Sequence, residues 1–542
     1  MPPMSARAPV AVFLAQLPFA STEPPIGLAQ LLGVVKAAGY PCGVFDLNLG
    51  LYHRHRAVDP DLWWRATPFV WQDPAFIGSL LERHRAWLES EFLSKIDAAD
   101  KPVVGFSCND ISLVASQMLA REIKKRRPDA LIVFGGQYFT QLDPPQQKAF
   151  AASMEADAVV LGDGEETLVE LLALRKEDRG LENCAGLLLR GPSGEAVFTE
   201  PREPVDLDTL PMADYTGFDL SRYRSERLTA DDLLFMGSRG CVRHCSFCGF
   251  RTGWPGYRRM SAERLHAEIV HQRSVWTSLG RTPRRIKFYD LLINGDMANL
   301  RRLCGLLVKS GEPVLPWDEC NAIVRKEMTE GFCREFKAAG GRQLIVGVES
   351  GSQRVLDIMK KEQTVDDIAA VLTNVAAAGL RTRANFMVGH PGETEEDFQA
   401  SLRLIERLAP VLHEVYPSYD FTYLSGPLAK DPERFGLAGE QHHLFWESRD
   451  GENSYPVRVE RYRRLREFCQ AHGVSVGEGV NMPTEAFVDI SLARYHEHRK
   501  ELGPALDRYR RYHERVGKDG YVASKIEELR RAVSPPDSGR KP

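Results

Sequence analysis

The chain lacks the marks of a membrane or nucleic-acid protein. No apolar run reaches the ~20 residues that a membrane-spanning helix needs, and a formal net charge of -4 gives no basic footprint for nucleic acid. The ten cysteines are scattered apart from one loop, which argues against a secreted disulfide scaffold and for a reducing compartment. We therefore expect a cytoplasmic protein with no membrane and no nucleic-acid partner.

The composition is that of an ordinary globular protein, with 43% hydrophobic and 27% charged residues. At 542 residues the chain has room for two or three domains, because domains hold roughly 100–200 residues each. The apolar run 9–15 is too short for a leader peptide, and Gln16 ends it, so it predicts a first buried strand.

Three cysteines form the one dense motif. Cys241, Cys245 and Cys248 are spaced C-x3-C-x2-C, and Phe247 precedes the third. Thiolates bind soft metals and iron–sulfur clusters, and spacings this short let one loop wrap one centre. A structural zinc needs a fourth ligand, and the nearby His244 lies inside the loop, a poor position for it. The residues favour a four-iron cluster, in which three cysteines leave one iron open to a ligand.

Strands and helices alternate over the first 200 residues. We predict strands at 10–14, 43–45, 102–106, 130–134 and 158–161, and helices at 26–38, at 111–125 and through Leu172. Near-continuous apolar strands of this kind form a parallel, doubly wound sheet, which binds ligands beyond the carboxyl ends of its strands. The residues at that edge are Ser107, Gly135, Gly136, Gly162, Gly164 and Glu165. Glycines after strands also make plain turns, so this signal is weak alone.

A second alternation follows a proline-rich segment at 201–230, which is typical of a linker. The expected strands are 233–236, 286–289, 314–317, 343–348, 382–387 and 415–423, with helical patterns such as 262–275 and 365–378 between them. The first of these strands leads into the cysteine loop. In barrels of strand–helix units the chemistry sits at the C-terminal ends of the strands.

The cysteine motif resembles that of the radical S-adenosylmethionine superfamily. Four stretches, 24–28, 105–107, 134–136 and 162–166, resemble the cobalamin-binding domain that precedes the radical domain in one large branch. The resemblance covers roughly residues 10–430. It implies an α/β fold in three parts: a Rossmann-like cobalamin-binding domain over 1–200, a partial (β/α)6 TIM-like barrel over 231–430, and a mostly helical region over 431–542.

The resemblance also implies three cofactors: a [4Fe–4S] cluster on the three cysteines, S-adenosylmethionine on the open iron, and cobalamin in the N-terminal domain. Many cobalamin domains ligate cobalt through an Asp-x-His-x-x-Gly motif. None of the fourteen histidines here has an aspartate two residues before it. We therefore expect cobalamin with its lower base displaced and no histidine on cobalt through that motif.

Several strand ends match the family's S-adenosylmethionine motifs. Carried over, these motifs place Phe247 by the adenine, Asp290 near the methionine part, Asn321 and Arg325 at the carboxylate, Glu349 with Ser350 at the ribose, and Gly389 and Pro391 on the adenine side. Each position alone also has a structural explanation, because the 389–392 stretch makes a good turn and Glu393 suits a first helical turn. No residue is assigned as catalytic.

Two regions carry no family motif. The insertion 51–100 holds four tryptophans and forms either a helical cap with its own core or a cover for the corrin or the substrate. We predict C-terminal helices at 458–472 and 492–514 that close the barrel, and a disordered tail from about 534. Four aromatic residues line the pocket or belong to the core: Tyr416, Tyr419, Tyr423 and Trp446.

The reaction implied by the resemblance is methylation of an unactivated carbon in a small-molecule or natural-product precursor, using a deoxyadenosyl radical and methylcobalamin. The alternatives are a non-methylating radical cyclisation or ring rearrangement and, as a minor one, a non-catalytic cofactor-binding sensor. A methylthiotransferase is disfavoured, because Cys42, Cys108 and Cys184 do not resemble that family's second cluster motif. The expected partners are a small-molecule substrate and an external electron donor such as flavodoxin or ferredoxin, with the chain itself a monomer.

Overall fold

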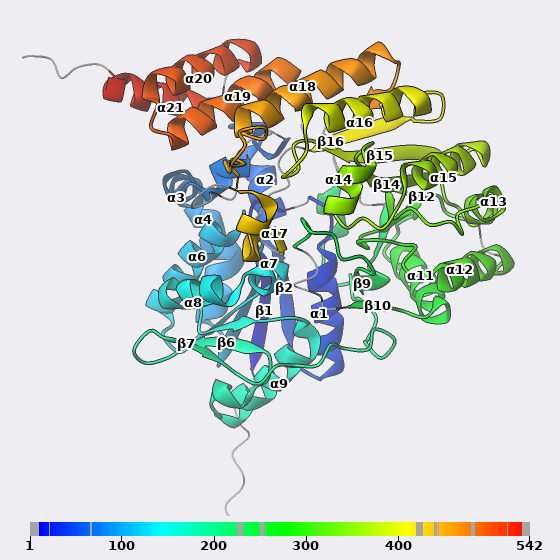
Figure 1. The fold of residues 1–542 in the computed structure, drawn as a ribbon. Coiled ribbons are helices and arrows are strands. Elements are labelled where there is room, and N and C mark those ends of the chain that lie inside the picture. Colours follow the sequence, from blue (N-terminus) through cyan, green and yellow to red (C-terminus); the bar gives the residue numbers. More distant parts are fainter. Residues whose placement is uncertain are drawn as a thin grey trace, which may run out of the picture.

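The computed structural model describes residues 10–20, 22–64, 68–224, 231–249, 254, 256–311, 313–418, 427–437, 442, 444–477, 483–517 and 519–533. They form an N-terminal α/β domain, a central barrel-like domain and a C-terminal layer of helices (Figure 1). Within these residues no helix is both long and apolar enough to cross a membrane. The predicted fold class is confirmed.

The N-terminal sheet has the strand order β2-β1-β3-β4-β5-β6-β7. Its strands are β1 (Ala11–Gln16), β2 (Cys42–Asp46), β3 (Pro102–Ser107), β4 (Leu131–Gly135), β5 (Ala158–Val160), β6 (Leu187–Arg190) and β7 (Ala196–Phe198). The first five are parallel and all of them were predicted from their apolar runs, which are largely buried in β1, β3, β4 and β5 and half-buried in the edge strand β2. The antiparallel edge of β6 and β7 was not predicted.

Helices cover this sheet, among them α1 (Ile26–Ala37), α6 (Leu113–Arg126), α7 (Gln137–Gln141), α8 (Pro144–Ser153) and α9 (Gly164–Glu177). The strand order reverses at β1, which pairs with β2 on one side and β3 on the other. In doubly wound sheets such a switch point opens a crevice beyond the carboxyl ends of the strands. The residues expected to bind a cofactor end β3 and β4 and follow β5 at this edge.

The insertion folds as a cap of short helices: α2 (Leu47–His55), η1 (Leu62–Trp64), η2 (Pro68–Gln72), α3 (Pro74–Arg83), α4 (Arg85–Leu88), η3 (Glu89–Leu93) and α5 (Ser94–Asp97). Trp63 and Trp71 are buried with ring centroids 4.9 Å apart. Asn48 accepts a 2.8 Å hydrogen bond from the Trp63 indole. Phe19, after β1, packs 5.6 Å from Trp71. The cap therefore has its own aromatic core and also lies beside the carboxyl end of β1.

The barrel domain is divided into two sheets. One holds β8 (Asp232–Phe235), β11 (Arg285–Phe288) and β12 (Trp317–Asp318); the other holds β13 (Cys320–Ala322), β14 (Gln343–Glu349), β15 (Arg381–Met387), β16 (Glu414–Ser418) and β17 (Ser475–Val476). All neighbours in both sheets are parallel. Glu319 separates β12 from β13 with a φ of +59°. The strand predicted at 314–317 was therefore wrong in its position, and the strand predicted at 415–423 is described only to Ser418.

Helices α11 (Ala262–Ser278), α12 (Met297–Lys309), α13 (Glu330–Ala338), α14 (Gln353–Ile358), α15 (Val365–Ala377) and α16 (Glu395–Leu408) flank the barrel. The segment predicted as a linker packs between the two domains over 201–224. Gln30 of α1 donates to the Pro211 carbonyl over 2.8 Å, and Gln272 of α11 donates to the Ala213 carbonyl over 2.6 Å. Residues 225–230 lie outside the described residues.

The C-terminal region contains α17 (Pro427–Lys430), η6 (Glu433–Phe435), α18 (Tyr455–Ala471), α19 (Thr484–His498), α20 (Leu502–Val516) and α21 (Gly520–Val533), of which the last four form the layer. The single helix predicted at 492–514 was wrong, because the chain turns at Lys500, whose φ is +60°. Figure 1 shows α18 to α21 lying across one end of both other domains. Tyr521 of α21 packs against Phe69 and Phe76 of the cap. The predicted tail lies outside the described residues.

Candidate functional site

The cysteine loop connects the two strands of a hairpin, β9 (Ser238–Gly240) and β10 (Tyr257–Arg259), whose last pair includes Gly240. Cys241 therefore follows directly on the paired base of the loop. Gly240 has a φ of +80°, and a Cβ there would lie 1.8 Å from the Gly256 carbonyl oxygen. Only glycine fits, so the backbone holds the two ends of the loop in contact.

The three cysteines are half-buried and free of disulfides. Burial raises the pKa of the Cys245 thiol to about 11, while Lys361 opposes that shift and Cys248 adds to it. Among the residues that the structure describes, no three His, Cys, Asp or Glu side chains converge closely enough for one metal ion. A four-iron cluster needs a wider arrangement, because each cysteine binds a different iron. The donor set fits that cluster, and His244 is exposed.

Glu349 ends β14 beside a buried cation. Its φ is +69°, at the point where the pairing of β14 with β15 shifts register. Its Oε1 atom lies 3.1 Å from the Lys361 Nζ atom, and 13% of its side chain is exposed. Burial alone would lower the pKa of Lys361, but Glu349 and the Cys245 thiol raise it. The charge on Lys361 thus fixes a carboxylate that still has an open side for a ligand.

Ser350 has a different environment from Glu349. It is fully buried, and its hydroxyl lies 3.3 Å from the Ser401 hydroxyl on α16. Ser401 also accepts from the Gly351 amide over 2.9 Å. The structure therefore gives Ser350 a packing contact between β14 and α16, and its expected contact with the cofactor stays a prediction.

Phe247 and Ser246 connect the cysteine loop to the end of β15. Phe247 packs on a small cluster of Val355, Met359 and Met387. The Ser246 hydroxyl lies 3.4 Å from Nε2 of His390. His390 is fully buried, which lowers its pKa to about 4, so the ring is neutral and donates from Nδ1 to the Pro391 carbonyl over 2.8 Å.

The turn after β15 contains Gly389 and Pro391 and is closed by Glu393. The Gly389 amide donates to Oε2 of Glu393 over 2.5 Å, and Arg461 of α18 lies 3.1 Å from the same oxygen. Gly389 has a φ of +76°. Burial raises the pKa of Glu393 to about 7, although Arg461 opposes the shift. Asn453 donates to the His390 and Glu393 carbonyls, so the C-terminal region fixes the turn expected at the adenine.

Asp290 and Asn321 meet at the end of β11. Asp290 is buried and accepts hydrogen bonds from the Gly237 amide over 3.0 Å and from the Ser238 hydroxyl. Burial raises the pKa of Asp290 to about 6. Asn321 donates to the Asp290 carbonyl over 3.1 Å. The Asp290 side chain thus supports the entry to β9, the Asn321 side chain holds the Asp290 backbone, and a contact of either with the cofactor stays a prediction.

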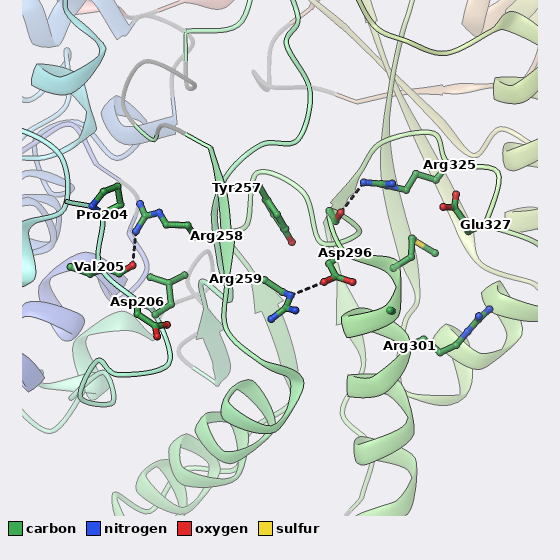
Figure 2. Close-up of a pocket in the computed structure, with 14 residues that line it drawn as sticks. Pro204, Val205, Asp206, Tyr257, Arg258, Arg259, Asp296, Arg301, Arg325 and Glu327 are labelled. Carbon is green, nitrogen blue, oxygen red and sulfur yellow. Dashed lines mark hydrogen bonds and ion pairs between the residues drawn. The ribbon is translucent and has the colours of Figure 1, made fainter.

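Arg325 lies apart from Glu349, on a cavity of about 1010 Å³ (Figure 2). It donates to the Gly295 carbonyl over 2.7 Å. The charges around the cavity are mixed, because Arg259 is paired with Asp296 over 2.8 Å and Glu327 lines the same wall as Arg325. A contact of Arg325 with the cofactor carboxylate stays a prediction.

The N-terminal residues lie at one edge of the sheet. Gly136 has a φ of +118°, and a Cβ there would lie 2.2 Å from the Cys108 carbonyl oxygen. The Gly162 amide donates to the Thr140 hydroxyl over 2.9 Å. Glu165 is buried and its carboxylate is paired with Arg239 of β9. Ser107, Gly135 and Gly164 lie at the same edge, at or just beyond strand ends.

The four aromatic residues considered for the pocket have different environments. Trp446 is buried, and the Arg458 guanidinium lies 3.8 Å from its ring centre, which places it in the core. Tyr416 is half-buried on β16 with Arg383 6.0 Å from its ring. Tyr419 and Tyr423 lie outside the described residues.

Sequence reasoning missed Lys361, His390, Asn453 and Arg461. Lys361 stands in a Lys-Lys pair, and Arg461 stands in an arginine-rich run within the helix predicted at 458–472, and charge runs of this kind are typical of solvated surfaces. His390 lies between Gly389 and Pro391 in the adenine-side stretch, and this position between two turn residues could have indicated its structural role. Nothing local marks Asn453.

Comparison with known proteins identifies two domains in the chain. Residues 236–405 match the Radical SAM superfamily model and residues 79–172 match the B12 binding domain model. An uncharacterized methyltransferase of Pyrococcus horikoshii is 24% identical over 327 residues, 59% of this chain and 67% of that protein. An anaerobic magnesium-protoporphyrin IX monomethyl ester cyclase of Rubrivivax gelatinosus is 24% identical over 360 residues, 64% of this chain and 62% of that protein. This chain thus spans about two thirds of either relative.

The fold also resembles a solved structure over nearly its whole length. The radical S-adenosylmethionine methyltransferase TsrM of Kitasatospora setae, with cobalamin and a [4Fe–4S] cluster bound, superposes with a TM-score of 0.60 at 17% identity, covering 96% of this chain and 99% of that one. The chain therefore carries a radical S-adenosylmethionine domain behind a B12-binding domain, and the cofactors of these domains are a [4Fe–4S] cluster, S-adenosylmethionine and cobalamin.

Proposed function

We propose that this protein is a cobalamin-dependent radical S-adenosylmethionine methyltransferase that acts on an unactivated carbon of a small molecule. The observation that carries the proposal is a direct contact between the carboxyl edge of the N-terminal sheet and the base of the cysteine loop. Glu165, at the carboxyl edge of the N-terminal sheet, is paired with Arg239, two residues before Cys241. This ion pair supports placing both proposed cofactor sites near the contact between the two domains.

When bound, the three cofactors supply a hydrogen-abstracting radical and a transferable methyl group. The residues of the chain bind and orient them. Cys241, Cys245 and Cys248 hold the cluster, and Glu349 accepts from the ribose hydroxyls. Phe247 and the turn at Gly389 form the adenine side, and the cap with the C-terminal helices keeps water out.

The proposal includes the location of the protein, its electron donor and its oligomeric state. A one-electron donor of the flavodoxin or ferredoxin class reduces the cluster in the cytoplasm, and the chain acts as a monomer of 60.9 kDa. Size-exclusion chromatography with light scattering reads the mass. A twofold larger mass contradicts the monomer.

The test uses S-adenosylmethionine labelled in the methyl group and candidate small-molecule precursors. Methylation predicts labelled product with S-adenosylhomocysteine and 5′-deoxyadenosine in near-equal amounts, because each turnover consumes two S-adenosylmethionine molecules, one as the methyl donor and one as the source of the radical. The similarity to the cyclase favours a second candidate, a non-methylating ring-forming reaction. That reaction predicts deoxyadenosine and altered substrate without label.

The matched control separates cluster chemistry from other thiol effects. Replacing Cys241, Cys245 and Cys248 by Ala abolishes deoxyadenosine formation if they hold the cluster. Cys42→Ala, another half-buried cysteine, leaves it unchanged. Turnover that survives in the triple variant contradicts the proposal for both reactions.

A further inference from the structure

The base of the cysteine loop carries two like charges. Arg239 of β9 and Arg258 of β10 are directly opposite each other in the hairpin. Like charges directly opposite on paired strands destabilise the pair. A hairpin that closes the loop through these two positions needs a counter-charge.

Asp163, from the turn between β5 and α9, supplies that counter-charge. Its Oδ1 atom lies 2.7 Å from Arg239 Nη1, and its Oδ2 atom lies 2.7 Å from Arg258 Nη1. Glu165 is also paired with Arg239. Only 3% of the Asp163 side chain is exposed, so water does not screen these contacts. Burial would raise the pKa of Asp163, but the two arginines hold it below its usual value.

The ion pairs join two domains. Asp163 and Glu165 lie within the segment that matches the B12 binding domain, and Arg239 and Arg258 lie within the segment that matches the radical domain. We propose that Asp163 and Glu165 are positioning residues for the cysteine loop: carboxylates of the B12-binding domain clamp the two arginines at the base of the loop. This assigns Glu165 to the loop instead of the corrin. The inference rests on the proposed cluster site.

The first test is Asp163→Asn in full-length protein reconstituted with iron and sulfide. Without the bridging charge the two arginines repel and the loop loosens. Iron should be lost to a chelator about tenfold faster than from the wild type, as for other residues that orient metal ligands. Wild-type retention overturns the inference.

The matched control is Asp489→Asn. Asp489 is also 3% exposed and also bridges two arginines, Arg508 and Arg515, but entirely within the C-terminal helices. This variant should lose about as much thermal stability as Asp163→Asn but should keep the wild-type rate of iron loss. If it releases iron as fast as Asp163→Asn, the effect is general destabilisation and the inference fails.

The rescue variant is the sharpest test. Asp163→Asn combined with Arg258→Gln removes the repulsion along with the bridge, so iron retention should return most of the way to wild type. A purely structural loss at Asp163 predicts that the double variant is worse than either single variant, which overturns the clamp. If Asp163→Asn does not fold, Glu165→Gln removes only one contact and should show a smaller change in the same direction.

Cobalamin retention, followed by its visible absorbance, separates the clamp from a corrin contact. The clamp predicts that Glu165→Gln keeps cobalamin at the wild-type level while it loses iron faster. Loss of cobalamin with unchanged iron overturns the inference. The proposed function fails separately, if the triple cysteine variant retains as much iron as the wild type.

Discussion

Glu349 ends β14, Glu393 follows the neighbouring strand β15, and each carboxylate is paired with a buried cation, yet of the two only Glu349 is partly exposed. The Glu349 carboxylate lies 3.1 Å from Lys361 with 13% of its side chain exposed. The Glu393 carboxylate lies 3.1 Å from Arg461 with none exposed. The difference comes from the C-terminal region, which covers Glu393 and leaves Glu349 open.

The comparison teaches that a carboxylate in a cofactor motif can have a structural role instead of a binding role. Glu393 closes the turn through the Gly389 amide, and α18 fixes it from outside through Arg461. Glu349 is fixed from one side only, by Lys361. We therefore expect changes at Glu393 to appear in stability and changes at Glu349 to appear in cofactor binding.

The largest effect is expected from Arg461→Met, which leaves a buried carboxylate without its cation. Above the Glu393 pKa of about 7 the free energy of unfolding should fall by about 3–5 kcal/mol. Below that pKa the loss should be smaller, because Glu393 is then protonated. Denaturant unfolding one pH unit below and one above the Glu393 pKa measures the free energy of unfolding in each state. Arg463→Met, on the exposed face of the same helix, is the control, and equal losses at both pH values contradict the prediction.

Next in size is the pH dependence of the wild type. The folded state raises the pKa of Glu393 from 4.5 to about 7, so it binds this proton more tightly than the unfolded state does. The contribution of Glu393 to the free energy of unfolding should therefore fall by on the order of 3 kcal/mol as pH rises through this window. Glu393→Gln removes the effect, and exposed Glu396→Gln retains it. An unchanged pH profile in Glu393→Gln refutes the assignment.

Glu349→Gln tests the open member of the comparison. Losing a charged hydrogen-bond acceptor should weaken S-adenosylmethionine binding by about tenfold. Equilibrium dialysis of reconstituted protein with labelled cofactor gives the dissociation constant. Stability should fall as well, because the change leaves Lys361 buried without its carboxylate, so the affinity is the deciding readout. A large loss of stability with unchanged affinity would place Glu349 in the scaffold with Glu393.

The smallest effect is expected from Ser401→Ala. It removes the acceptor of the Gly351 amide, which should cost about 1 kcal/mol of unfolding free energy. Cofactor affinity should not change, because the Ser350 and Ser401 hydroxyls contact each other behind β14. If the affinity falls as far as in Glu349→Gln, Ser350 belongs to the cofactor site.

Local signals account for what the sequence could predict. The cysteine spacing and the apolar strands are short-range patterns, so the loop, the parallel sheets and their order of appearance are visible in the chain. The partners of the motif residues are not, because Arg461 is 68 residues from Glu393 and Arg239 is 74 residues from Glu165. The left-handed turns at Glu319 and Lys500 involve residues that rarely adopt them, so composition gave no warning.

The break at Glu319 has a mechanical consequence. At the third strand the two barrel sheets are joined by the chain itself and by an isolated bridge from Trp317 to Gly341, in place of the continuous ladder that joins β14 to β15. The barrel wall is therefore most compliant along this line, and a bulky substrate that widens the mouth strains the third strand first. Amide hydrogen exchange at Glu319 and Asn321 should exceed that at Ile345 and Val346, and equal protection would mean a uniformly stiff wall.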